Sequence, residues 1–255
     1  MERKELIEQN AKIFQKLGKE LNEHASKNCK SLVIANPANT NCLILSHYAS
    51  SIDKKNFTCL TRLDQNRAVF QITEQFKRLI ENFEQSNISG VIIWGNHSST
   101  QFPDINYAKY DGKLLKEYFK DKLKFECFKQ DLTEKVQKRG ADIIEFRGLS
   151  SGFSAAIAIK DHFRDWYFGT GSKYTSMGII SDGSYNVDKG LCFSYPVLCT
   201  GNFQYEIKQN LEFDDIGLEK MRLTMKELNE EKSEVVLEWI PIIQINKEYN
   251  WYNDY

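Results

Sequence analysis

His97 stands where reactive side chains are often found. It follows the apolar run 91–94 and lies in the polar segment 95–101. Polar residues after a buried strand are where α/β folds bind ligands, and an imidazole titrates near neutral pH, so it can accept and return a proton. The other histidines lie in helical segments, where solvated or packing roles are the default: His24, His47 and His162. On position alone, a packing role for His97 remains open beside a catalytic one.

A second group of reactive residues occupies the segment 60–67, which contains Arg62, Asp64 and Arg67 at the N-terminal end of a predicted amphipathic helix. A carboxylate hydrogen-bonded to one imidazole nitrogen fixes the tautomer and raises the basicity of the other nitrogen. A guanidinium binds a carboxylate through two parallel hydrogen bonds. With His97, these are the parts needed to oxidise a 2-hydroxy acid, except for a hydride acceptor. The alternative is structural, with Asp64 as a helix N-terminal charge and Arg67 as a surface residue.

Hydrophobic periodicity predicts the elements that position these groups, because helical spacing indicates helices and short apolar runs indicate strands. The predicted helices are 6–27, 43–48, 66–84, 132–146, 151–167 and 217–237, and the predicted strands are 31–35, 90–95, 174–181, 192–199 and 203–207. A helix–strand–helix order is followed by helices mixed with antiparallel strands. This order predicts an α/β unit joined to an α+β domain, with a break around residues 56–61.

Composition argues against several classes of function. Lys and Arg number 34 and Asp and Glu number 35, so the net charge is −1, and we expect no general attraction to nucleic acid or to an anionic membrane. No apolar run reaches the ~18 residues that span a bilayer, and the charged amphipathic N-terminal segment is unlike a signal peptide. The six cysteines lack CxxC spacing. This is typical of reduced thiols in a cytosolic protein, and we predict no metal site.

Two nucleotide-binding motifs are missing from the sequence. No Gly-x-Gly-x-x-Gly follows a predicted strand and opens a helix, and no Gly-x-x-x-x-Gly-Lys-Ser/Thr loop occurs. The Gly-x-Gly at 169–171 follows a predicted helix, so it predicts a turn.

Four long motifs have the same order and spacing as those of a known family: ANPANTN at 35–41, LTRLDQNR at 60–67, IWGNHSSTQ at 93–101 and SMGIISDG at 176–183. With the segments 149–156 and 219–228, they resemble cytosolic malate dehydrogenases of the lactate/malate dehydrogenase family. The resemblance implies a remnant of a Rossmann NAD-binding domain over residues 1–59 and the α+β C-terminal catalytic domain over residues 60–255. It also implies NAD as cofactor, malate and oxaloacetate as substrates, a homodimer and a cytoplasmic location.

The resemblance implies a role for each matching residue. His97 is expected to accept the hydroxyl proton of malate, with Asp64 as its orienting partner, while NAD takes the C2 hydride. Arg67 matches the arginine that binds the substrate carboxylate, and Arg3 matches a mobile-loop arginine that reads the distal carboxylate. Asn36 matches a residue that contacts both substrate and nicotinamide. The remaining cofactor contacts are implied for Asn10, Ile34, Ala35 and Ser154.

The sequence departs from the family pattern in several places. The family has about one Rossmann βαβ half before the position of Met1, which includes the glycine-rich turn, the acidic residue for the adenosine ribose and the first loop arginine. Leu17 stands where the family has a cofactor-contacting glutamine, and Ala35 replaces a glycine. The region 70–88 is a few residues longer than expected, and the tail 244–255 has no counterpart.

Three interpretations are consistent with these observations. The first is a working malate dehydrogenase of which this sequence is an incomplete part, since residues 1–4 match the middle of the family's loop. The second is a half-enzyme that needs a separate NAD-binding chain. The third is a non-catalytic structural or interaction paralogue. The third predicts drift at the catalytic positions, yet Asp64, Arg67 and His97 all stand in their motifs.

Overall fold

The computed structural model describes residues 3–236, without the side chains of residues 3–6, 8 and 236. Its first unit contains α1 (Arg3–His24), β1 (Ser31–Val33), α2 (Ala38–Tyr48) and β2 (Phe57–Cys59). The two helices approach closely at Gly18 of α1, where a Cβ would lie only 2.7 Å from the Cβ of Tyr48 of α2. Glycine leaves room for this approach. The predicted order of helix, strand and helix is confirmed.

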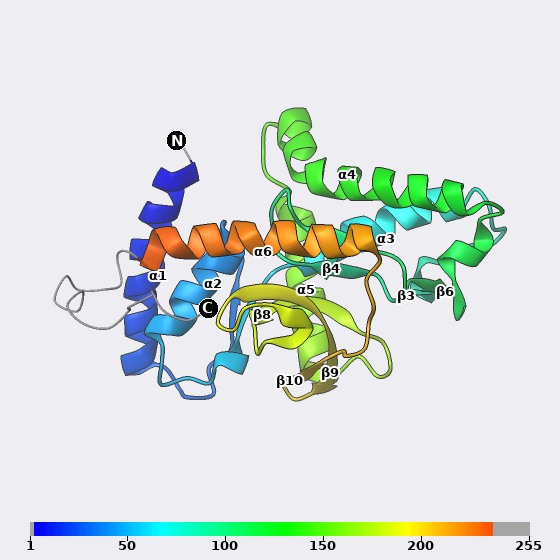
Figure 1. Cartoon of the computed structure of the whole chain (residues 1–255). Coiled ribbons are helices and arrows are strands. Elements are labelled where there is room, and N and C mark those ends of the chain that lie inside the picture. The colour runs from blue at the N-terminus through cyan, green and yellow to red at the C-terminus, as the bar shows by residue number, and fades with distance from the viewer. Residues whose placement is uncertain (1–2, 237–255) are drawn as a thin grey trace, which may run out of the picture.

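One five-stranded sheet joins this first unit to the rest of the molecule (Figure 1). Its strand order is β1-β2-β8-β9-β10, with β8 (Thr175–Ile180), β9 (Cys192–Gly201) and β10 (Gln204–Ile207). β1 and β2 are parallel, whereas the pairs β2–β8, β8–β9 and β9–β10 are antiparallel. The sheet is therefore mixed, and it is continuous across the predicted break at residues 56–61.

The predicted strand 90–95 forms the fully buried β4 (Ile92–Trp94), which is not a strand of the five-stranded sheet. It pairs antiparallel with β5 (Phe102–Asp104), and Gly95 forms an isolated bridge to Ser194 of β9. The segment 95–101 is therefore a hairpin loop attached to the main sheet. The sequence predicts that His97 follows a buried strand of an α/β sheet. In the structure, the segment does not follow a parallel strand. A separate small sheet contains β3 (Ile88–Ser89), β6 (Lys109–Tyr110) and β7 (Lys113–Leu114).

Within the described residues, four further α-helices follow: α3 (Arg62–Phe76), α4 (Lys122–Arg147), α5 (Gly152–Phe168) and α6 (Asp215–Val236). In Figure 1, α6 runs across the front of the molecule, with one end beside α1 and the strands β8 to β10 below it. The helices predicted at 151–167 and 217–237 agree closely with α5 and α6.

The bounds of α3 and α4 differ from the predicted helices 66–84 and 132–146. α3 ends well before residue 84, because later apolar residues of the stripe pack outside a helix. Phe83 stacks on Tyr110 of β6 with ring centroids 4.6 Å apart. α4 begins well before residue 132, where the Asp121 carboxylate accepts the backbone N–H of Leu123 at 2.9 Å. This N-cap, and not an apolar stripe, defines the start of α4.

The main hydrophobic core lies between the sheet, α5 and α6. Its largest fully buried side chains include Trp94 of β4, Trp166 of α5 and Tyr195 of β9, and α6 contributes Met221 and Leu228. Separate clusters pack α3 against α4 and α1 against α2 and the parallel strands. The loop that carries His97 is therefore bordered by elements with firmly packed cores.

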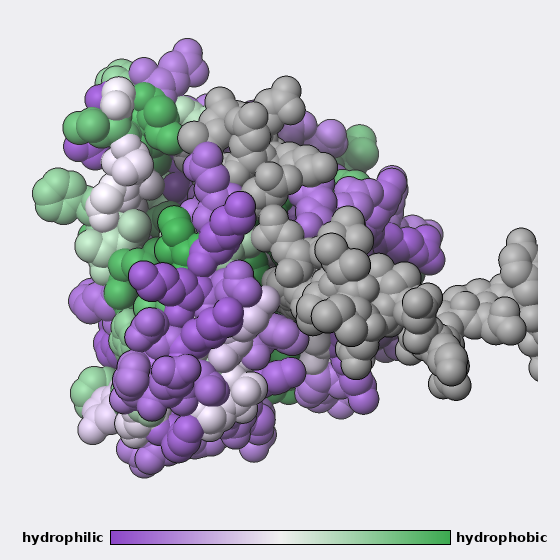
Figure 2. Space-filling model, turned by 90° about the vertical axis from the view of Figure 1, so that its left-hand side faces the viewer, coloured by the Kyte–Doolittle hydropathy of each residue, from purple (hydrophilic) through white to green (hydrophobic). Residues whose placement is uncertain are grey.

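One face of the molecule is mainly polar (Figure 2). Figure 2 shows one face, on which hydrophilic residues predominate and hydrophobic residues gather in smaller patches. Within residues 3–236, none of the helices is long and apolar enough to cross a membrane. The same residues contain no group of three or more His, Cys, Asp or Glu side chains arranged to hold a metal ion.

Candidate active site

His97 and Asp64 meet although they belong to different elements. Asp64 lies in the first turn of α3 with a fully buried side chain, and His97 lies in the β4–β5 loop with a side chain that is 16% exposed. The ring Nδ1 of His97 contacts Oδ2 of Asp64. The charge of Asp64 raises the pKa of His97 above its usual value, against the lowering effects of burial and of Arg67. The imidazole is therefore arranged to take up a proton and hold it beside a carboxylate.

Arg67, three residues after Asp64 on α3, also contacts the Asp64 carboxylate. Its Nη1 donates to Oδ1 of Asp64 at 3.2 Å, and its Nη2 donates to Oγ of Ser151 at 3.4 Å. Asp64 thus divides its two oxygens between the imidazole and the guanidinium. The Nε–H of Arg67 is buried and has no hydrogen-bond partner among the described residues. A buried donor without an acceptor is costly, and a carboxylate is the group that a guanidinium binds best.

Asn36 lies beside His97, in the loop between β1 and α2. The residues that line a cavity of about 180 Å³ here are Ile7, Asn36, Pro37, Asn96, His97, Ser98 and Glu231. Asn10 of α1 donates through Nδ2 to the backbone oxygen of Asn36 at 2.9 Å, so α1 helps to position this loop. The backbone oxygen of Ala35 accepts a side-chain amide N–H from Asn41 of α2, and Ile34 is 47% exposed.

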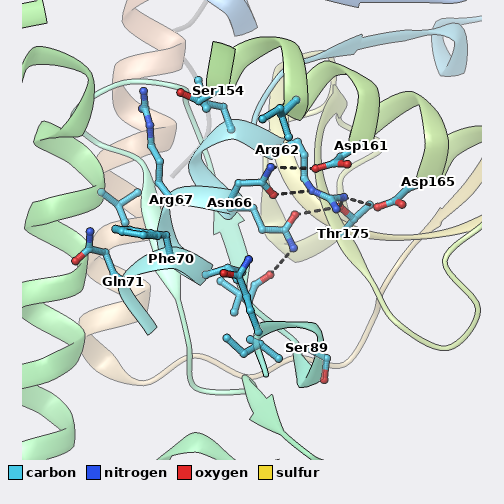
Figure 3. Close-up of a pocket in the computed structure, with 18 of the residues that line it drawn as sticks. Arg62, Asn66, Arg67, Phe70, Gln71, Ser89, Ser154, Asp161, Asp165 and Thr175 are labelled. Carbon is cyan, nitrogen blue, oxygen red and sulfur yellow. Dashed lines mark hydrogen bonds and ion pairs between the residues drawn. The ribbon is translucent and has the colours of Figure 1, made fainter. Parts of the chain in front are cut away.

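Ser154 lies in the first turn of α5 and lines a different, larger cavity of about 980 Å³. Arg67 also lines this cavity. Figure 3 shows Arg67 reaching toward the end of the cavity where Ser154 lies, away from Arg62. The structure therefore places Ser154 with Arg67, and Asn36 with His97. Arg3 begins α1, and the role predicted for it falls on a side chain that lies outside the described residues.

Arg62, the other arginine of the segment 60–67, holds α3 in place. Its Nη1 contacts Oδ2 of Asp165 of α5 and donates to Oγ1 of Thr175 of β8 at 2.5 Å. One turn later, Asn66 donates to Asp161 of α5 at 3.2 Å, and Figure 3 shows these contacts in the cavity wall. The network joins α3 to α5 and β8, and so fixes the helix that carries the carboxylate and guanidinium of the site.

The other histidines have the default roles that the sequence predicts. Burial and the nearby Arg62 lower the pKa of His162 to about 3, and its Nε2 lies 3.1 Å from Oγ1 of Thr58. It is therefore a neutral packing residue. His24 has a side chain that is 72% exposed, and His47 is exposed on α2.

Sequence reasoning missed the residues that hold the His97 loop. Asn39 of α2 accepts the backbone N–H of His97 through Oδ1 at 2.9 Å and donates to the backbone oxygen of Gly95 at 3.2 Å. From α6, Thr224 and Glu227 contact the same loop. Gly95 has φ +90°, and a Cβ there would lie 2.2 Å from Oγ1 of Thr224, so glycine is what lets the loop approach α6. The one sequence signal was helical spacing, which puts residues 224 and 227 on one face of α6.

Comparison with known proteins identifies the family of this chain. Residues 61–238 match the lactate/malate dehydrogenase alpha/beta C-terminal domain, and residues 1–58 match the lactate/malate dehydrogenase NAD binding domain. The cytoplasmic malate dehydrogenase of Medicago sativa is 46% identical over 235 residues, which cover 91% of this chain and 69% of that protein. The chain therefore belongs to the lactate/malate dehydrogenase family.

Solved structures of relatives share the fold. Malate dehydrogenase from Naegleria fowleri matches with a TM-score of 0.85 and 36% identity, covering 93% of this chain and 70% of that chain. Trichomonas vaginalis lactate dehydrogenase in complex with NADH and oxamate matches with a TM-score of 0.83 and 30% identity, covering 93% of this chain and 72% of that chain. The predicted fold class, part of a Rossmann NAD-binding domain followed by the C-terminal domain, is confirmed.

Proposed function

We propose that the chain carries the catalytic residues of a malate dehydrogenase, which interconverts (S)-malate and oxaloacetate with NAD. The observation that carries the proposal is the contact chain His97–Asp64–Arg67, in which one buried carboxylate touches both the imidazole and the guanidinium. The malate dehydrogenase from Medicago sativa supports the choice of substrate.

The proposed chemistry follows from the orientation of the imidazole. During malate oxidation, the hydroxyl proton passes to Nε2 of His97 as the C2–H bond breaks and the C2 carbonyl forms. NAD, when bound, supplies the acceptor for the C2 hydride. Asp64 faces Nδ1 and stabilises the imidazolium. In the reverse direction, the imidazolium returns its proton to the carbonyl oxygen, and the raised pKa of His97 favours that charged form.

Three residues are proposed to bind the substrate. The guanidinium of Arg67 would hold the carboxylate next to C2, and its buried Nε–H, without a partner among the described residues, supports this assignment. Asn36 would donate its amide, because it lines the cavity that also contains His97. Arg3 would bind the substrate's distal carboxylate. This assignment rests on the family resemblance.

The residues proposed to bind NAD are assigned to contacts with its nicotinamide end. Ile34 exposes apolar surface at the end of β1, two residues before the exposed Asn36, and Asn10 supports this loop. Ala35 and Ser154 are the other proposed contacts. The sequence contains no glycine-rich turn whose backbone amides would hold the pyrophosphate. The proposed contacts are therefore limited to the nicotinamide end of the cofactor.

Malate formation from oxaloacetate tests the proposal. The assay uses millimolar NADH, and the product is measured by chromatography. His97→Asn is expected to lower the rate by about 10²–10⁴-fold, because it removes the proton donor. The control His24→Asn, at a side chain that is 72% exposed on α1, is expected to leave the rate unchanged. Turnover that survives His97→Asn, or no turnover by the unaltered chain, contradicts the proposal.

A homodimer is a second part of the proposal. α5 exposes large apolar side chains at helical spacing, among them Phe153 and Ile157, and Phe168 lies at its end. Exposed apolar patches of this kind mark protein interfaces. Sedimentation equilibrium is expected to show a dimer that Ile157→Asp converts to monomers. A monomeric unaltered chain at micromolar concentration contradicts this part.

A cytoplasmic location and a division into domains 1–59 and 60–255 are also proposed. The name of the Medicago sativa relative supports the location, and imaging of a fluorescent fusion tests it. The two family matches, over residues 1–58 and 61–238, support the division. Because residues 59–61 are buried, expression of residues 60–255 alone tests the division, and failure of that segment to fold contradicts it.

A further inference from the structure

The loop that carries His97 rests on one polar face of α6. The backbone N–H of Asn96 donates to Oγ1 of Thr224 at 2.8 Å. The side-chain amide of Asn96 donates to Oε2 of Glu227 at 2.9 Å and to Oε1 of Glu231 at 3.0 Å. Past the histidine, the hydroxyl of Ser98 also donates to Oε2 of Glu227.

Glu227 connects the two sides of His97 through a single oxygen. Its Oε2 accepts from Asn96 before the histidine, and from Ser98 and Thr100 after it. Three hydrogen bonds from one short segment to one oxygen therefore fix the path of the loop on both sides of the imidazole.

The His97 ring has little freedom left once the loop path is fixed. Its backbone N–H is held by Asn39 of α2, and its ring contacts Asp64 of α3. The charged groups around the ring are Asp64 and Arg67 of α3 and, across the smaller cavity, Glu231 of α6. A shift of the loop away from α6 would change the ring's distance to Asp64.

We propose that Glu227 is a positioning residue, which holds the β4–β5 loop so that the His97 ring stays against Asp64. The inference deepens the proposed dehydrogenase function and rests on it. Glu227 acts through Asn96, Ser98 and Thr100 and takes no direct part in proton transfer.

Histidine NMR titration of the unaltered chain and of variants tests this role. The Cε1–H signal of His97 is assigned by its loss in His97→Gln. Glu227→Leu removes the acceptor and is expected to lower the proton affinity of His97 by about tenfold, because the Asp64 contact loosens. Glu227→Gln keeps a carbonyl acceptor without the charge and is expected to keep most of the affinity. Glu230→Leu, at an exposed position on the same helix, is the control and is expected to have no effect.

The variants separate positioning from direct electrostatics. If Glu227→Gln lowers the affinity as much as Glu227→Leu, the charge of Glu227 acts directly and the positioning role is overturned. An unchanged affinity in Glu227→Leu overturns it as well. If Glu227→Leu does not fold, the double variant Ser98→Ala/Thr100→Val decides, because it removes two donors and leaves the charge in place. The same fall is expected there, and no fall overturns the proposal.

Failure of this inference is distinguishable from failure of the proposed function. If His97 in the unaltered chain has a pKa at or below its ordinary value, the His97–Asp64 pair itself is wrong. If that pKa is raised but does not respond to the loss of Glu227 or of its donors, the pair stands and the positioning role is wrong.

Discussion

Replacing Asp64 with asparagine removes one negative charge from the centre of the site with almost no change in shape. The carboxylate is fully buried, and it contacts both His97 and Arg67. Breaking a buried ion pair costs about 3–5 kcal/mol when the remaining charge stays buried. Here the imidazole can lose its proton, and the Arg67 side chain is 13% exposed, so part of the remaining charge is relieved. We therefore expect Asp64→Asn to lower the free energy of unfolding by about 3 kcal/mol.

The loss in free energy of unfolding caused by Asp64→Asn is expected to depend on pH. The charge of Asp64 raises the pKa of His97 in the folded state above the unfolded value of about 6.5. A raised histidine pKa stabilises the fold fully below the unfolded pKa, and this stabilisation is lost as the pH rises through the folded pKa. Because Asp64→Asn removes that contribution, the loss in free energy of unfolding is larger at about pH 6 than at about pH 9.

Urea unfolding at the two pH values measures this difference. The fluorescence of Trp94 and Trp166, which are both fully buried, reports the loss of the fold. The control Asp131→Asn removes the same charge from an exposed pair with Lys135 and is expected to change stability by less than about 1 kcal/mol at either pH. A loss in Asp64→Asn that is equal at the two values, or larger at the higher one, would refute the reasoning.

Three further predictions concern the loop, the substrate arginine and the cofactor. Gly95→Ala is expected to lower the free energy of unfolding by about 2–5 kcal/mol, because its positive φ is combined with overlap between the new Cβ and Thr224. The control Gly112→Ala has a positive φ but open space and should cost less in the same urea assay. Arg67→Gln is expected to weaken oxaloacetate binding about a hundredfold and to raise the pKa of His97, because the guanidinium lowers it. Kinetics and NMR measure these effects, and a fall in that pKa contradicts the second. Calorimetric titration of the 255-residue chain with NADH is expected to show affinity weaker than micromolar, since the sequence lacks the phosphate-binding turn.

Much of the fold follows from hydrophobic spacing, and its failures have physical causes. α5 and α6 carry clear apolar faces, and their predicted bounds agree with the structure. The apolar stripe that begins in α3 continues beyond Phe76, but Phe83 uses the same spacing to stack on Tyr110 outside a helix. α4 buries little of its N-terminal half, where Phe125 is the buried residue before position 132, so its early start left a weak signal.

The site was predictable only where residue type and motif carry the information. His97, Asp64 and Arg67 were selected from the sequence, and the structure brings them into contact. Asn39 and Glu227 were not selected, because the residues next to them in the sequence do not indicate that their side chains contact the β4–β5 loop. They lie 58 and 131 residues from the loop residues they contact. Such contacts arise from tertiary packing. Helical spacing places residues 224 and 227 on one face of α6, but it does not show what that face contacts.

The most direct measurement is the proton affinity of one imidazole. Carbon-13 labelling of histidine, with the Cε1 signal of His97 followed from acid to alkaline pH, gives its pKa in the unaltered chain and in Asp64→Asn. We predict a pKa above the ordinary histidine value in the first protein and below it in the second, where burial and Arg67 act without the carboxylate. Identical titration curves for the two proteins would contradict the pairing on which the proposed proton transfer depends.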